Sequence, residues 1–228
     1  MTSSTTSPHL AARTLDPVVG LPSGPFRCIV ADPPWEMGKM GKGRDMRPGR
    51  VYQIGHNIKT PYPTMTLAEI EAMPVADLAD EAAHLWLWTT NKTLEDGFKV
   101  MRAWGFKYLA PIHWIKPAGI GAWFVHVSQT CLFGYKGKCV FPLARYRRNV
   151  IQTGPPKRHS EKPEEAFALI ESVSPGPRLE LFARRERPGW TVWGNEVPCK
   201  ANPEGLRTRH FVEGTQHPLV VAPNLPEK

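Results

Sequence analysis

The sequence predicts an α/β fold in which a mainly parallel sheet is covered by helices on both faces. Short apolar segments alternate along the chain with segments of helical periodicity, which is the pattern of strand–helix–strand units. The apolar segments are hydrophobic over their whole length, as strands are when both faces of the sheet are covered. The predicted strands are residues 26–31, 84–89, 106–116, 130–135, 179–183 and 191–194.

Helix signals stand between these strands. The predicted helices are residues 66–73, 94–104 and 161–173. Thr66 and Glu69 have the spacing of a capping box at the start of the first helix. Gly105 is a typical residue to end the second helix, and Pro163 fits the first turn of the third. The Gly-containing segment 117–123 predicts a loop.

One domain is expected over residues 22–198 of the 228-residue chain. Residues 1–21 are rich in Ser, Thr and Pro and predict a flexible N-terminal arm, and residues 199–228 predict a loosely attached C-terminal tail. No apolar run has the length of a membrane span, so no membrane partner is expected. The first 25 residues do not resemble a signal peptide, which favours a cytoplasmic protein.

Charge and cysteine content narrow the class of partner. The formal net charge of +8 favours a polyanion such as a nucleic acid. The four cysteines form no Cys-x-x-Cys pair and share no ligand spacing with histidines, so no metal site is predicted. Oligomeric state is left open by the sequence.

The motif Asp32-Pro33-Pro34-Trp35 directly follows the first predicted strand. Ligands of parallel sheets bind beyond the carboxyl ends of the strands, which places this motif at the expected site. Two consecutive prolines hold an extended path without backbone donors. The result is a rigid ledge of acceptors, with a carboxylate on one side and an indole on the other.

Such a ledge suits an exocyclic amine on an aromatic ring. Asp32 and the Pro33 carbonyl can each accept an N–H of the amine while Trp35 stacks on the base. Two acceptors free the nitrogen lone pair and stabilise the positive charge that develops on nitrogen during transfer. An adenine N6 amine, a cytosine N4 amine and a protein side chain all fit this description, and a plain rigid turn is the structural alternative.

Ordered sequence blocks accompany the motif. They are ADPPW at 31–35, YPTMTLAEI at 62–70, HLWLWTTN at 84–91, AWGFKY at 103–108, WIKP at 114–117, CLFGYKG at 131–137, RHSEKPEE at 158–165 and SPGPRLELFARRERPGWTVWGNE at 174–196. In these blocks the sequence resembles the MT-A70 family of adenine-N6 methyltransferases. The resemblance implies a Rossmann-like, S-adenosylmethionine-dependent methyltransferase fold in permuted order, where the catalytic motif precedes the main cofactor segment.

The resemblance also implies roles for single residues. It makes Asp32, Pro33, Pro34 and Trp35 the catalytic residues. It places Lys162 near the methionine carboxylate of S-adenosylmethionine, Arg184 near the ribose, and Asn195 and Glu196 near the cofactor adenine. The segment 123–130 lacks the acidic residue and asparagine that eukaryotic members tend to have there, so the choice of substrate stays open.

Basic residues flank the expected pocket. Arg44 and Arg47 follow the motif, and Lys157 and Arg158 precede the predicted third helix, so phosphate contact is expected for all four. The short chain resembles bacterial and phage members, which favours DNA over RNA and the cytoplasm of a bacterial or phage-infected cell. The alternatives are a cytosine-N4 methyltransferase and a non-catalytic, nucleic-acid-binding partner subunit of the same fold.

Overall fold

A computed structural model of the protein describes residues 20–36, 62–120, 124–141, 146–154 and 161–198. Within these ranges the chain forms a seven-stranded sheet in the order β5-β3-β4-β2-β1-β6-β7. The strands are β1 (Phe26–Ala31), β2 (Ala79–Thr89), β3 (Lys107–Ile120), β4 (His126–Lys136), β5 (Val150–Gln152), β6 (Arg178–Leu181) and β7 (Trp190–Trp193). The helices are α1 (Leu67–Glu71), α2 (Val75–Leu78), α3 (Leu94–Ala103) and α4 (Glu164–Val173).

Strand β4 is the exception in an otherwise parallel sheet. It pairs antiparallel with β2 and β3, whereas β1 is parallel to β2 and β6, β6 to β7, and β3 to β5. All the described strands except β4 therefore run in one direction, which confirms the predicted mainly parallel sheet. Their carboxyl ends meet along one edge, called the carboxyl edge below.

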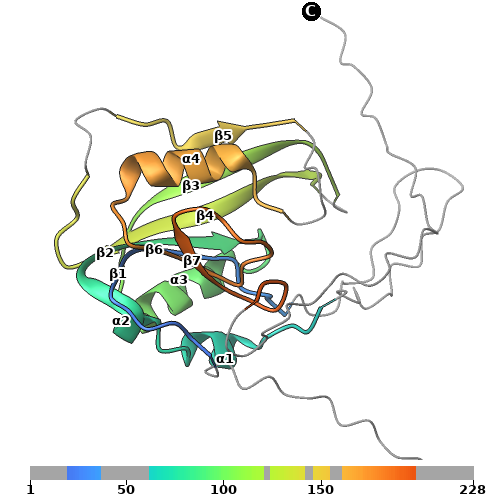
Figure 1. The fold of residues 1–228 in the computed structure, drawn as a ribbon. Coiled ribbons are helices and arrows are strands. Elements are labelled where there is room, and N and C mark those ends of the chain that lie inside the picture. Colours follow the sequence, from blue (N-terminus) through green and yellow to red (C-terminus); the bar gives the residue numbers. More distant parts are fainter. Residues whose placement is uncertain (1–19, 37–61, 121–123, 142–145, 155–160, 199–228) are drawn as a thin grey trace, which may run out of the picture.

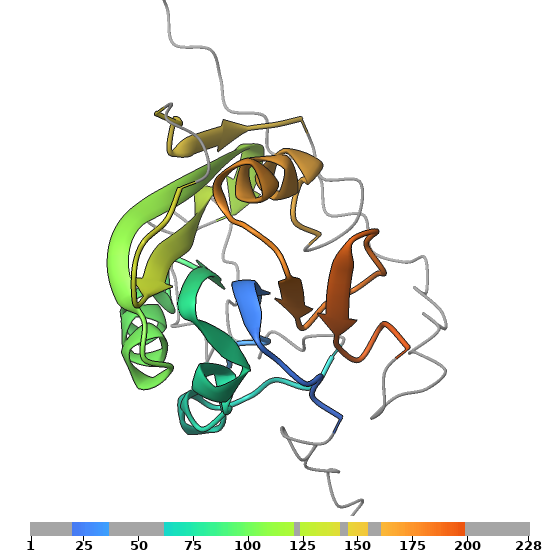
Figure 2. The same cartoon turned by 60° about the vertical axis from the view of Figure 1, so that its left-hand side comes forward.

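Helices cover both faces of this sheet, as predicted. Helix α4 lies on one face, and α1, α2 and α3 lie on the other (Figures 1 and 2). The residues of β1 alternate between the two faces accordingly. Ile29 and Ala31 pack in the core with α1 to α3, whereas Cys28 and Val30 pack in the core with α4.

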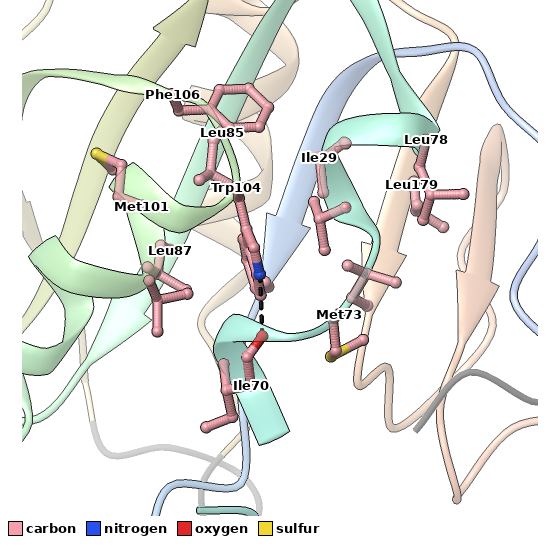
Figure 3. Packing of buried hydrophobic residues seen from close by; sticks show 14 of the residues in the cluster. Ile29, Ile70, Met73, Leu78, Leu85, Leu87, Met101, Trp104, Phe106 and Leu179 are labelled. Carbon is pink, nitrogen blue, oxygen red and sulfur yellow. Dashed lines mark hydrogen bonds between the residues drawn. The ribbon is translucent and has the colours of Figure 1, made fainter. Parts of the chain in front are cut away.

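The core under α1 to α3 is closed by a hydrogen bond between two helical segments. Trp104, at the end of α3, is 1% exposed, and its indole Nε1 donates to the Ile70 carbonyl of α1 at 2.9 Å (Figure 3). A buried indole needs such an acceptor because an unpaired donor in an apolar core costs about 1–3 kcal/mol. This bond holds α1 against the end of α3.

Local sequence patterns correctly predicted the ends of several helices and strands. Strand β1 has the predicted bounds, Thr66 and Glu69 form a capping box, and Gly105 has φ +79° after α3. Helix α4 begins only at Glu164, because Pro163 has extended backbone and acts as the N-cap. The predicted helix from residue 161 is wrong in its first turn.

Pairing between strands changed other boundaries. The sequence predicts a loop from residue 117, yet β3 continues to Ile120, which pairs with His126 of the antiparallel strand β4 after a register shift that follows Ile115. Strand β2 begins five residues before the predicted start at residue 84. Strand β5 and helix α2 are too short to leave a periodic signal and were not predicted.

A buried polar cluster joins β2 to the end of α4. Trp86 Nε1 donates to Ser174 Oγ at 2.9 Å, and His84 Nδ1 lies 2.9 Å from the same oxygen. Burial lowers the pKa of His84 to about 4, so the ring is neutral and Ser174 can donate to it. Helix α4 is thereby fixed to the sheet.

Replacing Ser174 with alanine should therefore destabilise the protein. The change leaves two buried nitrogen groups without a partner, and we expect a loss of roughly 2–4 kcal/mol in the free energy of unfolding. Denaturant unfolding measures this loss. Ser172→Ala is the control, because Ser172 Oγ donates to the Leu169 carbonyl within α4 and accepts a long bond from the exposed Arg147. An equal loss in both variants would contradict the expectation.

Candidate active site

The Asp32–Trp35 motif lies at the carboxyl edge, directly after β1. The Trp35 N–H donates to the Pro33 carbonyl at 2.8 Å, and the Met65 N–H donates to the Pro34 carbonyl at 2.8 Å. Trp35 also forms an isolated parallel bridge with Met65, just before α1. Both proline carbonyls thus already accept one backbone bond. Each oxygen has a second lone pair, so the ledge can still accept from a ligand.

Trp35 is an anchor of this ledge. Its side chain is 6% exposed and packs in the core beneath α1 to α3, and its Nε1 donates to the Trp88 carbonyl at 3.0 Å. An indole held in this way has little surface left for a base, so its burial favours an anchoring role over the predicted stacking role. What Trp35 does is fasten the end of the motif to β2.

Lys162 and Asp32 form a close ion pair between the Lys162 Nζ and the Asp32 Oδ2. The lysine side chain is 8% exposed and the aspartate side chain 24%. The Lys162 ammonium also lies 5.3 Å from the centre of the Trp88 ring. Lys162 stands two residues before α4 rather than in its first turn. The pair uses only one carboxylate oxygen, which leaves Oδ1 for a second donor.

The predicted ribose and adenine contacts lie together at the next two strand ends. Arg184 follows β6 and pairs with Glu196, which follows β7, at 3.2 Å. The Arg184 guanidinium also lies 4.9 Å from the centre of the Tyr62 ring. Asn195 is exposed beside Glu196. These three side chains therefore lie at the same edge of the sheet as the Asp32–Lys162 pair, on the β6–β7 side of β1.

A glycine makes this arrangement possible. A Cβ placed on Gly194 would lie 2.3 Å from the Ala183 carbonyl oxygen, so only glycine lets the chain after β7 pass the chain after β6. The Ala183 N–H donates to the Trp193 carbonyl at 2.9 Å across the same gap. The approach sets Arg184 and Glu196 within ion-pair distance.

Comparison with known proteins agrees with this geometry. The family described as MT-A70 matches residues 26–196, which is most of the chain and includes every strand of the sheet. The chain belongs to the MT-A70 family. Its fold is accordingly the Rossmann-like, S-adenosylmethionine-dependent methyltransferase fold with the permuted motif order that the sequence predicted.

The similar proteins include N(6)-adenosine-methyltransferases and a type II methyltransferase. An Arabidopsis thaliana N(6)-adenosine-methyltransferase MT-A70-like protein is 29% identical over 202 residues, 82% of this chain and 26% of its own length. The human N(6)-adenosine-methyltransferase catalytic subunit METTL3 is 28% identical over 195 residues, covering 76% of this chain and 28% of its own. The Mycoplasma type II methyltransferase M.MunI is 31% identical over 189 residues, covering 78% and 80% respectively. The chain therefore spans less than a third of its plant relatives and most of M.MunI.

One charged group in this MT-A70 chain was not found from the sequence. Glu180 of β6 is 16% exposed, and burial raises its pKa to about 7, with the Asp32 charge adding to the effect and Arg187 opposing it. The Arg187 Nε lies 3.8 Å from Glu180 Oε2, and Arg187 also donates to Glu164 of α4 at 2.7 Å. Arg187 is itself 11% exposed and lies 3.4 Å from the centre of the Phe167 ring. No local pattern predicts a buried acid in a strand, because its partners come from elsewhere in the chain.

Glu180→Gln should change how stability depends on pH. The unfolded chain releases this proton near pH 4.5, whereas the native state keeps it until about 7. Between those values the native state binds more protons at Glu180, so the contribution of Glu180 to the free energy of unfolding falls as pH rises, by roughly 3 kcal/mol in total at about 1.4 kcal/mol per unit. Glu180→Gln lacks this contribution, so its free energy of unfolding should increase relative to that of the wild type as pH rises from 4.5 to 7. Denaturant unfolding at pH 4.5, 6 and 7.5 measures the difference, in which the opposite His84 contribution cancels. A difference between variant and wild type that stays the same at all three pH values would contradict this prediction.

Several predictions fall on residues outside the described ranges. Arg44, Arg47, Lys157 and Arg158, the predicted nucleic-acid contacts, are among them, as are most of the predicted arm and tail. The described residues contain no group of three His, Cys, Asp or Glu side chains that could hold a metal ion. They also contain no helix long and apolar enough to cross a membrane.

Proposed function

We propose that this protein transfers a methyl group from S-adenosylmethionine to the N6 amine of adenine in a nucleic acid, with DNA favoured over RNA. The observation that carries the proposal is the pairing of Lys162 with Asp32 at the carboxyl edge. It sets a cation suited to an amino-acid carboxylate beside a carboxylate suited to an amine. Asp32 directly precedes the ledge formed by Pro33 and Pro34, and Lys162 reaches it from the segment before α4.

The residues present fit S-adenosylmethionine. Lys162 would hold the methionine carboxylate, and Arg184, Asn195 and Glu196 would hold the ribose and the cofactor adenine. The close approach of Gly194 to Ala183 brings those polar groups together, and a side chain at position 194 would fill this space. When bound, S-adenosylmethionine supplies a methyl group on a positively charged sulfur.

On the protein side, the reaction depends on holding and activating the target amine. Asp32 Oδ1 and the free lone pair of the Pro33 carbonyl would accept the two N–H groups of the amine. These bonds favour the tetrahedral nitrogen that has an available lone pair, and they stabilise its developing positive charge. Because Trp35 fixes the ledge to β2, the acceptors keep their geometry, so the amine is oriented before it reacts.

A flipped or single-stranded adenine is the substrate form that this site requires, because a base inside a duplex cannot reach the ledge. The preference for DNA is supported by the similarity to the type II methyltransferase M.MunI, which is 31% identical over 189 residues. Arg44, Arg47, Lys157 and Arg158 remain the proposed phosphate contacts.

Product analysis tests the proposal. Purified protein is incubated with labelled S-adenosylmethionine and with separate DNA and RNA pools, and the modified nucleosides are identified by mass. We expect N6-methyladenine, mainly in DNA, and roughly 100- to 1000-fold less of it from an Asp32→Asn preparation made in parallel. N4-methylcytosine would instead support the cytosine enzyme, and cofactor binding without transfer to either pool would support the non-catalytic subunit.

A further inference from the structure

The carboxyl edge has two halves, separated by β1. Of the residues that fit the cofactor, Arg184, Asn195 and Glu196 follow β6 and β7, on one side, and Lys162 is paired with Asp32 at the end of β1. On the other side lie β2, β4 and β3, and near the carboxyl end of β3 stands Lys116. The spacing of neighbouring strands places β3 roughly 14 Å from β1 and further still from β6. Lys116 therefore belongs to the half of the edge opposite Arg184, Asn195 and Glu196.

Two lysines stand on two adjacent indoles. Trp88 and Trp114 meet edge to face with ring centres 6.3 Å apart. The Lys162 ammonium lies 5.3 Å from the centre of the Trp88 ring, and the Lys116 ammonium lies 4.5 Å from that of Trp114. Trp114 is fixed in turn by its Nε1, which donates to Thr153 Oγ1 at 2.8 Å, just after β5. Both ammonium groups thus rest on one rigid aromatic floor.

The two lysines differ in their counter-charge. Lys162 is paired with Asp32, whereas Lys116 donates to a neutral acceptor, Gln129 Oε1, at 3.2 Å. Within the described ranges no carboxylate forms an ion pair with Lys116. Burial lowers the pKa of Lys116, and the Lys162 charge lowers it further while Asp32 opposes the shift. The floor therefore carries two positive charges against one negative charge, and a half-buried cation without a counter-ion favours an anionic ligand.

We propose that Lys116 binds a backbone phosphate of the strand that carries the target adenine and so positions the base on the Asp32 ledge. This inference rests on the proposed function, because it names the group that holds the substrate at the same site. Lysine is a common phosphate ligand and acts as a compact point charge. The cofactor carboxylate is the less suitable anion for Lys116. Lys162 is paired with Asp32 at the end of β1 and therefore lies closer than Lys116 to the residues that follow β6 and β7.

The test compares two lysines of the same strand. Lys116→Gln removes the charge at the carboxyl edge, and Lys107→Gln removes an exposed charge at the opposite end of β3. Binding of a single-stranded, adenine-containing oligonucleotide is measured by fluorescence anisotropy at several salt concentrations, and S-adenosylmethionine binding by calorimetry. We expect Lys116→Gln to weaken oligonucleotide binding about tenfold and to reduce the salt slope by about one. Cofactor affinity should change less than about twofold, and Lys107→Gln should leave both affinities nearly unchanged.

Kinetics separate positioning from structural damage. Lys116→Gln should raise the KM for the oligonucleotide about tenfold with kcat nearly unchanged, and Lys116→Arg should recover most of the loss because it restores the charge. Equal losses in oligonucleotide and cofactor affinity would overturn the inference, as would equal effects at Lys116 and Lys107. The anisotropy measurement needs no turnover, so it reports on Lys116 even where the product analysis rejects adenine methylation.

Discussion

Asp32→Asn should lower the kcat of methyl transfer by about 100- to 1000-fold while leaving the protein folded. Asparagine has the same shape, but it offers one acceptor oxygen instead of a charged pair. Lys162 takes an oxygen of residue 32 in the native structure, so the remaining group facing the substrate would be an NH2. An NH2 repels the N–H groups of the amine that it must hold. The loss therefore comes from the chemical step.

The measurement is single-turnover transfer to an adenine-containing oligonucleotide at saturating cofactor. Asp77→Asn, on α2 and exposed, is the matched control and should retain full activity. Circular dichroism and a thermal melt of the Asp32 variant verify its fold, because Lys162 loses its charged partner. Activity within a few-fold of wild type would remove Asp32 from the mechanism.

Trp35→Ala should lower the free energy of unfolding by roughly 3–5 kcal/mol. The side chain is 6% exposed, so truncation opens a cavity in the core beneath α1 to α3. The Trp88 carbonyl also loses the indole donor at 3.0 Å. Trp35→Phe fills much of the space without the donor and should cost about 1–3 kcal/mol. Denaturant unfolding of both variants measures these values.

The same variants distinguish an anchoring role of Trp35 from the stacking role that the sequence predicts. An anchor predicts that Trp35→Phe loses stability and activity together, since the ledge is no longer fastened to β2. A stacking residue predicts a different result: Trp35→Phe would keep its activity because an aromatic ring remains. A stable Trp35→Ala protein with weakened oligonucleotide binding would contradict the anchor.

The sequence alone determined the features that depend on neighbouring residues. The apolar run of β1 ends where Asp32 begins, the capping box at Thr66 and Glu69 forms within one turn, and Gly105 ends α3 through its own backbone freedom. The carboxyl edge was predictable too, because parallel strands bring their ends together whatever their order. These features required no knowledge of which distant segments would meet.

Tertiary structure decided which side chains share the site. Lys162 reaches Asp32 across 130 residues of sequence. Lys116 stands near Lys162 because the indoles beneath them, Trp114 and Trp88, meet within one sheet. The neighbouring residues in the sequence also do not determine the direction of the Trp35 side chain. Either direction suits the residue after two prolines, and the direction into the core is selected by the Trp88 carbonyl and the apolar side chains packed there. Such contacts follow from strand order and helix packing, so only the assembled sheet determines the chemistry at its edge.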